Sequence, residues 1–387
     1  NLSFAIKPIS KDFSLSSIQS GFLLAAWMWP YAIANLPSGW LIDKFGINKV
    51  FIWSIMLWSI STILSGVITN YQELYLSRVA LGIAEAPFFI IGAKIIQLYF
   101  THHNRGLVSG IINLGPKIAN GFAPPLIAIL IITTSWRVMF IILGVLGFVI
   151  AFLWIKIYQP NFSSCISYDL TKYNKKIKFS LWKLINHKTT WWLNLGNLGS
   201  SYVFWLYFTW LPTYLIDNRG LNLKATGGIA ALPFIAGAIA VPFGGYLSDM
   251  LIKKYNVSTI RARVIPASLG CLIAGISVIP INYVNNLSIA IILFTISTFA
   301  VSFRVGVLWA LASEISPPTT VGTLGGIQNA ANFIGGALAP TISGIIIQYT
   351  ANYNIVFGIS GLLVILAAIC YTMIKSPILI EEISNLK

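Results

Sequence analysis

Long apolar runs, separated by short polar or Gly/Pro-containing breaks, recur along almost the whole chain. A helix that crosses a bilayer needs about 20 mostly apolar residues. Eleven runs reach that length, at residues 17–41, 48–68, 72–98, 105–132, 136–158, 188–216, 224–250, 262–283, 286–311, 320–348 and 353–374. Asn1 to about Ile9 is too short to span, and we interpret it as the end of a truncated first helix, because the chain has no initiator Met. The pattern predicts an all-α membrane protein with twelve transmembrane helices.

Composition agrees with a membrane protein and excludes several other classes. The 387 residues are 57% hydrophobic and 9% charged, whereas a soluble domain carries about 25% charged residues. The three cysteines lie too far apart for a zinc or redox motif, and we expect no disulfide. The three histidines have no acidic partner at ligand spacing, so no metal site is expected. The chain also lacks a phosphate-binding loop and a dinucleotide fingerprint, which argues against an ATP-driven pump.

The basic residues predict the orientation in the membrane. Loops rich in Lys and Arg stay on the cytoplasmic side, and the predicted spans place 16 of the 25 Lys and Arg residues on one side and five on the other. Both termini are therefore expected in the cytoplasm. The basic linker 159–187 separates an N-terminal bundle, 1–158, from a C-terminal bundle, 188–387. Beside a membrane, such a linker is more simply an anchor near anionic lipid than a nucleic-acid site.

Two patterns recur in both halves and indicate an internal repeat. Residues 39–43 (GWLID) match 245–249 (GYLSD) at an offset of 206, and 110–113 (GIIN) with Pro124 match 326–329 (GIQN) with Pro340 at an offset of 216. Each pair falls on equivalent helices, the second and eighth and then the fifth and eleventh. Parallel six-helix repeats with a site between them at mid-membrane are typical of secondary transporters.

Residues 39–46 (GWLIDKFG) resemble the signature that follows the second helix in the major facilitator superfamily. Three further stretches, 78–87 (RVALGIAEAP), 135–137 (SWR) and 209–215 (TWLPTYL), resemble the anion:cation symporter family. The resemblance implies a monomeric, multi-pass protein of a bacterial inner membrane. It would import a small organic anion, such as a sugar acid, together with protons by alternating access and without a cofactor.

Glu85 and Arg78 are the candidate proton-coupling residues. A charge at the bilayer centre costs at least about 2.5–3.5 kcal/mol, so an intramembrane charge is a functional candidate. The two residues are seven positions apart, nearly two full helical turns, and share a face. We expect Glu85 to carry the proton while Arg78 alternates between pairing with it and attracting cargo, and the resemblance implies the same role for Glu85. The alternative is a static ion pair.

Lys117 is the candidate contact for the cargo carboxylate. It lies about 18 Å into the fifth helix, near the midplane, and shares a face with Asn113 and Asn120. An ammonium flanked by amides suits an acid that also carries hydroxyl groups. The alternative is that Lys117 pairs with an acidic side chain. Further candidates come from the repeat partner of Asn113 and from positions that line the cavity in relatives: Asn329, Tyr202 and Trp309.

The Gly-rich cytoplasmic ends of the second and eighth helices hold the candidate gating residues Gly39, Asp43, Lys44 and Asp249. In the superfamily such carboxylates latch the two halves in the outward-facing state by meeting a helix N-terminus. A plain helix cap is the alternative reading.

Other functions compete with proton symport. An exchanger of phosphate esters needs more than one central cation, which Lys117 with Arg78 would provide. A nutrient sensor would usually add a soluble domain, and a membrane enzyme would show a metal-binding cluster, neither of which is present in the sequence. Lys94 is expected to extend to the interface. For Arg304 in the tenth helix, the sequence leaves open whether it faces the cavity.

Overall fold

The computed structural model describes residues 2–99, 102–157, 181–316 and 320–379, and within these ranges the ordered elements are all helices. The chain forms two compact units, Asn1–Asn174 and Lys175–Lys387, which are described separately.

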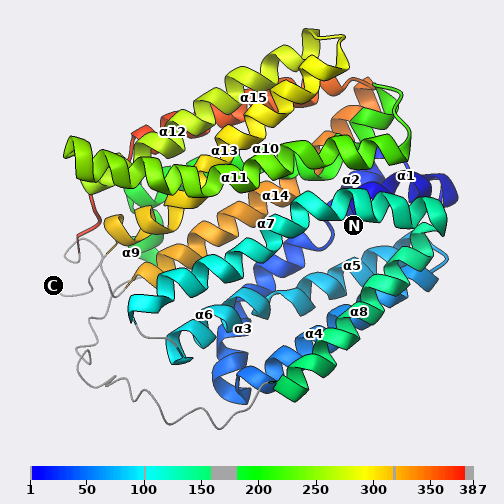
Figure 1. Cartoon of the computed structure of the whole chain (residues 1–387), viewed down its shortest axis with the longest axis horizontal. Coiled ribbons are helices and arrows are strands. Elements are labelled where there is room, and N and C mark those ends of the chain that lie inside the picture. Colours follow the sequence, from blue (N-terminus) through cyan, green and yellow to red (C-terminus); the bar gives the residue numbers. More distant parts are fainter. Residues whose placement is uncertain (1, 100–101, 158–180, 317–319, 380–387) are drawn as a thin grey trace. The chain divides into compact units, whose positions relative to one another are not determined.

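The described residues of the first unit form eight helices (Figure 1): α1 (Leu2–Asp12), α2 (Ser17–Ala25), α3 (Met28–Phe45), α4 (Ile47–Val67), α5 (Tyr71–Glu85), α6 (Pro87–Tyr99), α7 (His102–Thr133) and α8 (Trp136–Ile157). Two spans predicted as single helices are each divided, 17–41 at Ala26–Trp27 and 72–98 at Ala86. Pro87 explains the second break, because proline has no N–H to donate to the preceding turn and is favoured at the first position of a new helix.

The second unit contains α9 (Leu181–Asn186), α10 (Lys188–Asp217), α11 (Leu223–Tyr255), α12 (Thr259–Val278), a 3-10 helix η3 (Ile279–Tyr283), α13 (Leu287–Ile315), α14 (Val321–Thr350) and α15 (Tyr353–Thr372) (Figure 1). The six long helices α10 to α15 begin and end within five residues of the predicted spans.

The described residues include eight helical segments long and apolar enough to cross a membrane, and a shorter apolar helix, Ile118–Thr133. The long helix α10 falls outside the eight because it carries polar side chains in its buried surface, among them Asn197, Ser200 and Ser201.

Both units use the same helix pairings, in agreement with the internal repeat. In the first unit α1 packs on α7, α3 on α5 and α4 on α8; in the second, α10 packs on α14, α11 on α13 and α12 on α15. In the order of the predicted spans, these are the first with the fifth helix of each half, the second with the fourth, and the third with the sixth. The recurrence of one pairing scheme means that the two halves place equivalent helices in equivalent surroundings.

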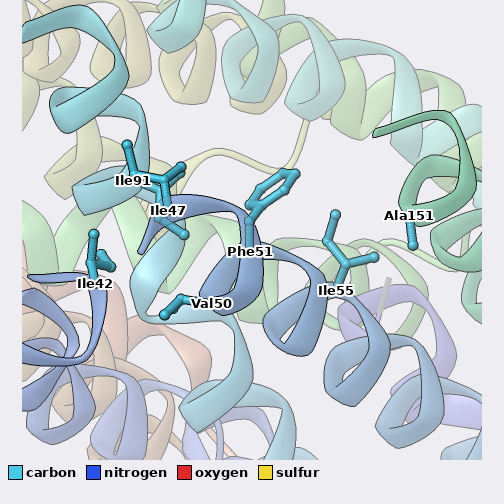
Figure 2. Close-up of a cluster of buried hydrophobic side chains, with 7 residues drawn as sticks. All are labelled: Ile42, Ile47, Val50, Phe51, Ile55, Ile91 and Ala151. Carbon is cyan, nitrogen blue, oxygen red and sulfur yellow. The ribbon is translucent and has the colours of Figure 1, made fainter. Parts of the chain in front are cut away.

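A buried apolar cluster fixes the end of α3 against its neighbours (Figure 2). It comprises Ile42, Ile47, Val50, Phe51, Ile55, Ile91 and Ala151 from α3, α4, α6 and α8. The ring centroids of Phe51 and Trp154 are 4.1 Å apart, and the indole N–H of Trp154 donates to Asn48 Oδ1 at 2.9 Å. Between α3 and α4, Gly46 has φ +84°, a left-handed conformation that glycine adopts without strain. These contacts hold the C-terminal end of α3, which contains Asp43 and Lys44.

Asp12 joins the end of α1 to the start of α8. Its Oδ2 accepts hydrogen bonds from Trp136 Nε1 at 2.9 Å and from Arg137 Nη1 at 2.8 Å. The hydrogen bond from Trp136, followed by that from Arg137, lowers the pKa of the Asp12 carboxyl below its ordinary value. A lowered pKa means that the pair stabilises the fold above the unfolded pKa of about 3.9 and that this contribution disappears as the pH falls through the lower folded value.

Asp12→Asn is accordingly expected to lower the free energy of unfolding at pH 7 by at most about 1 kcal/mol, since Asp12 and Arg137 are 41% and 37% exposed and solvent screens the pair. The measurement is thermal unfolding of purified wild type and variant at pH 7 and at pH 3. The difference between them should shrink at pH 3, and a difference that does not change with pH would contradict the assignment.

Candidate functional site

Arg78 lies inside the first unit, where neutral groups hold its guanidinium. It is 1% exposed. Its Nη2 donates to Ser65 Oγ of α4, and its guanidinium carbon lies 4.6 Å from the centroid of the Phe140 ring of α8. Ser65 Oγ is also 2.8 Å from Ser77 Oγ, so α4 and α5 share one buried polar contact. An aromatic face and hydroxyl oxygens stabilise a buried cation without neutralising it.

Glu85 is the last residue of α5 and lies directly before the helix break. It is half-buried. Its carboxylate and the Arg78 guanidinium are within electrostatic range, yet within the described residues no ion pair of 4.0 Å or less joins them. The Arg78 guanidinium donates a hydrogen bond to Ser65 instead. The Arg78 guanidinium therefore acts electrostatically on the Glu85 carboxylate without forming an ion pair with it.

Tyr31 of α3 is a neighbour of Glu85 that the sequence analysis did not single out. It is 3% exposed and lies within electrostatic range of the Glu85 carboxylate. Trp27 meets it edge to face at 5.8 Å, and Asn35 Nδ2 donates to its carbonyl at 2.9 Å. The available signal was the pair Tyr31 and Asn35, two polar side chains four residues apart on one face of an apolar run.

Gly82 allows α5 to approach the break between α2 and α3. A Cβ at Gly82 would lie 2.9 Å from the carbonyl carbon of Trp27 and still closer to its oxygen. Small residues permit such close backbone contact between membrane helices. Because Gly82 lies between Arg78 and Glu85 along α5, this contact also fixes how deeply both charged residues sit in the unit.

The three α7 candidates lie on one continuous helix. Asn113, Lys117 and Asn120 are four and three residues apart in α7, which places them on one face. Asn120 is half-buried, whereas the side chains of Asn113 and Lys117 lie outside the described residues. The shared face predicted from the sequence is thus present in the backbone.

The candidates in the second unit have different surroundings. Asn329 of α14 is half-buried. Tyr202 of α10 is 0% exposed, enclosed by protein on all sides. Trp309 lies in α13, and its side chain is outside the described residues.

Of the two candidate gating carboxylates, Asp43 and Asp249, the structure describes the side chain of Asp249. Gly39 lies within α3. The side chain of Asp43 lies outside the described residues, whereas the Lys44 ammonium lies 4.7 Å from the Trp40 ring centroid. Asp249 Oδ1 accepts a hydrogen bond of 2.6 Å from Arg263 Nη1 of α12, within its own unit. Asp249 thus joins the end of α11 to α12 in this state, and its gating role stays a prediction.

Arg304, whose direction the sequence left open, faces the interior of the second unit. It is 4% exposed. Its Nη1 donates to Asn197 Oδ1 at 2.6 Å and its Nη2 to Ser201 Oγ at 3.1 Å, both on α10. Each unit therefore holds a buried arginine that is bonded to neutral side chains.

Comparison with known proteins decides the family. The model of the Major Facilitator Superfamily matches residues 1–340. This chain belongs to the Major Facilitator Superfamily. It is a multi-pass membrane protein with the fold of that superfamily, and it is a secondary transporter, not an enzyme.

Individual relatives of this transporter extend the comparison. It is 30% identical to a probable L-galactonate transporter of Escherichia coli (strain K12), over 98% of this chain and 86% of the relative. It is 28% identical to a probable galactarate/D-glucarate transporter of the same strain, over 97% and 90%. Among solved structures, a bacterial homologue of the human lysosomal transporter Spinster in an inward-facing, unoccupied conformation superimposes with a TM-score of 0.80 at 19% identity, over 96% of this chain and 93% of that one. The resemblance to transporters of sugar acids is confirmed at the level of the family.

Proposed function

We propose that this transporter imports an organic anion, in the first instance a sugar acid, together with protons and by alternating access. The relatives named above support an organic-acid cargo, since their names describe transporters of galactarate, glucarate and galactonate. The observation that carries proton coupling is the pair on α5: Arg78 buried and bonded to Ser65, with Glu85 within electrostatic range but outside an ion pair.

The proposed coupling follows from this geometry. A buried carboxylate binds a proton more readily when a nearby cation moves away and releases it when the cation returns. Arg78 has an alternative partner in Ser65, so it can leave Glu85 without remaining unsatisfied. Glu85 lies at the helix break, where α5 and α6 can change their mutual angle without straining a continuous helix. A proton on Glu85 would then be taken up and released as the transporter changes its conformation.

Sixteen cationic residues on one predicted side against five on the other support cytoplasmic termini and a cytoplasmic basic linker. The bacterial relatives support a bacterial inner membrane as the location. We propose a monomer, with the cargo, protons and membrane lipid as its partners.

The cargo assignment is tested in proteoliposomes by counterflow, in which external labelled acid exchanges with unlabelled acid inside. D-Glucarate, D-galactonate and a neutral hexose serve as cargo candidates, and empty liposomes serve as the control. Accumulation of one of the labelled acids, with none of the hexose, is expected. Transport of the hexose without either acid would contradict the proposal.

Lys117→Gln tests the proposed carboxylate contact. The substitution keeps a polar side chain of similar length but removes the charge, so the affinity for an acid should fall by about 1.5–3 kcal/mol, the contribution of a hydrogen bond to a charged group. The measurement is the concentration of unlabelled acid that half-inhibits counterflow. The matched control is the corresponding lactone or amide, a neutral analogue whose affinity should fall much less. Equal losses for acid and neutral analogue would assign Lys117 a structural role.

A further inference from the structure

The Arg304 guanidinium connects α13 to two side chains one helical turn apart on α10. Its two terminal nitrogens bond separately to Asn197 and Ser201. Asn197 and Ser201 then each contact α14: Asn197 Nδ2 donates to the carbonyl of Gln328 at 2.6 Å, and Ser201 Oγ donates to Asn332 Oδ1 at 2.7 Å. The result is two parallel hydrogen-bonded chains that run from α13 through α10 to α14.

Arg304 sets the direction of every hydrogen bond in these chains. A guanidinium has only donors and stays protonated. The Ser201 oxygen must therefore accept from Arg304, which leaves its single proton for Asn332. The amide of Asn332 in turn presents its oxygen to Ser201, so that its NH2 group is directed away from the Ser201 hydroxyl. One permanent cation thus selects one of the two amide orientations of Asn332.

The NH2 group of Asn332 offers two hydrogen-bond donors on α14. Asn332 is half-buried, and within the described residues its Nδ2 makes no hydrogen bond. It lies three residues from Asn329, on the same face of α14. At Gly335 a Cβ would lie 3.2 Å from Leu198 Cα, so α10 and α14 are in close backbone contact beside this network. The Asn332 side chain is therefore held through its amide oxygen, on a helix that is closely packed against α10.

The network also leaves a positive charge in the second unit. Within the part of the chain that the structure describes, no carboxylate forms an ion pair with Arg304. Burying a charge without an opposite charge is costly, and a purely structural link between α10 and α13 would be served by a neutral side chain. The retained charge favours an anion on the amide donors that Arg304 orients.

We propose that Arg304 is a positioning residue for cargo: it orients Asn332 so that the amide NH2 donates to a carboxylate or hydroxyl oxygen of the transported organic anion. This inference rests on the proposed function. Asn332 is the specificity-determining contact, and Arg304 acts through Ser201 without touching the cargo.

The experiment measures counterflow of labelled D-glucarate and D-galactonate in proteoliposomes that contain the whole transporter. Arg304→Lys keeps the charge but replaces the two terminal nitrogens, which bond to Asn197 and Ser201, by a single ammonium. Ser201→Ala keeps Arg304 but removes the hydrogen bonds that connect it to Asn332. Both variants should raise the KM for the acid about tenfold, the effect of losing one hydrogen bond, and change the maximal rate less than twofold. Asn332→Asp, which replaces the donor by an acceptor beside an anion, should raise the KM more than either.

A double-mutant cycle separates positioning from general stability. If Arg304 and Ser201 act only through Asn332, Ser201→Ala combined with Asn332→Ala should be no worse than Asn332→Ala alone. Ser302→Ala is the matched control, a buried serine on α13 whose hydroxyl bonds to its own helix at Thr298, and its KM should stay within twofold of wild type. Size-exclusion profiles and thermal unfolding establish that each variant is folded.

Four outcomes would overturn the inference. Additive effects of the Ser201 and Asn332 substitutions would show that they act independently. A lower maximal rate at unchanged KM in Arg304→Lys would show a role in the conformational change instead. Wild-type counterflow of neither acid would remove the proposed function together with this inference, whereas active wild type with an unaffected Ser201→Ala would remove this inference alone.

Discussion

Glu85→Gln is expected to abolish accumulation of organic anion driven by a pH gradient, while counterflow of the same anion continues at a rate within a few-fold of wild type. Glutamine has nearly the shape of protonated glutamic acid and keeps hydrogen-bonding capacity, but it cannot bind and release a proton. Net uptake against a gradient requires that protons bind and are released during the transport cycle. Counterflow exchanges cargo without net proton movement, so the variant should still perform it.

The surroundings of Glu85 allow a loss of proton coupling to be distinguished from a loss of folding. The carboxylate is half-buried at the end of α5, and its charged neighbour Arg78 already bonds to Ser65. Neutralising Glu85 therefore breaks no ion pair within the described residues, and the fold should tolerate the change. Labelled uptake is measured with and without an imposed pH gradient, and thermal unfolding is the control for folding. Gradient-driven accumulation that survives the substitution would remove Glu85 from the coupling mechanism, and loss of both activities would assign it to cargo binding or conformational change.

The Glu73→Gln variant is a matched control for Glu85→Gln. Glu73 lies in the first turn of the same helix, where its backbone N–H is capped by the side chain of Asn70. The same chemical change, made at the helix end, should leave both gradient-driven uptake and counterflow close to wild type. A loss of coupling in Glu73→Gln as large as that in Glu85→Gln would mean that the effect is not specific to the interior carboxylate.

Gly82→Ala is expected to lower the free energy of unfolding by about 1–3 kcal/mol, the range for inserting one methyl group into a fully packed interior. The added Cβ would meet backbone atoms of Trp27, which cannot rotate away as a side chain can. Either α5 or the break between α2 and α3 must shift. Because Arg78 and Glu85 lie on α5 on either side of Gly82, the shift should also reduce gradient-driven uptake.

Gly228→Ala provides the control for Gly82→Ala. Gly228 lies inside α11, and a Cβ there has no atom within 4 Å. Alanine favours a helix over glycine by about 1 kcal/mol, so this variant should be unchanged or slightly more stable. Thermal unfolding in detergent compares the two variants with wild type. Equal stability of Gly82→Ala and Gly228→Ala would show that α5 does not make the close contact described here.

The hydrophobic pattern determined where most membrane helices lie. The predicted spans 48–68, 136–158 and 188–216 correspond to α4 (Ile47–Val67), α8 (Trp136–Ile157) and α10 (Lys188–Asp217), because a bilayer requires long apolar helices whose ends are polar. The repeated patterns also indicated an internal duplication, with which the matching helix pairings of the two units agree. The charged residues on α5 were identified as candidates for the same reason, since an ionisable group in an apolar run is too costly to retain without a role.

Which side chains meet across different helices was decided only by the tertiary structure. Spacing along one helix placed Arg78 and Glu85 on a common face, but it did not reveal that Arg78 bonds to Ser65 of α4 or that Tyr31 of α3 lies near Glu85. It likewise left the direction of Arg304 open, because that depends on how α13 packs against α10 and α14. Periodicity fixes the face of a residue on its own helix, whereas the partner on another helix depends on rotation and depth. Those two quantities are set by close contacts such as that of Gly82 with Trp27, made by atoms distant in the sequence.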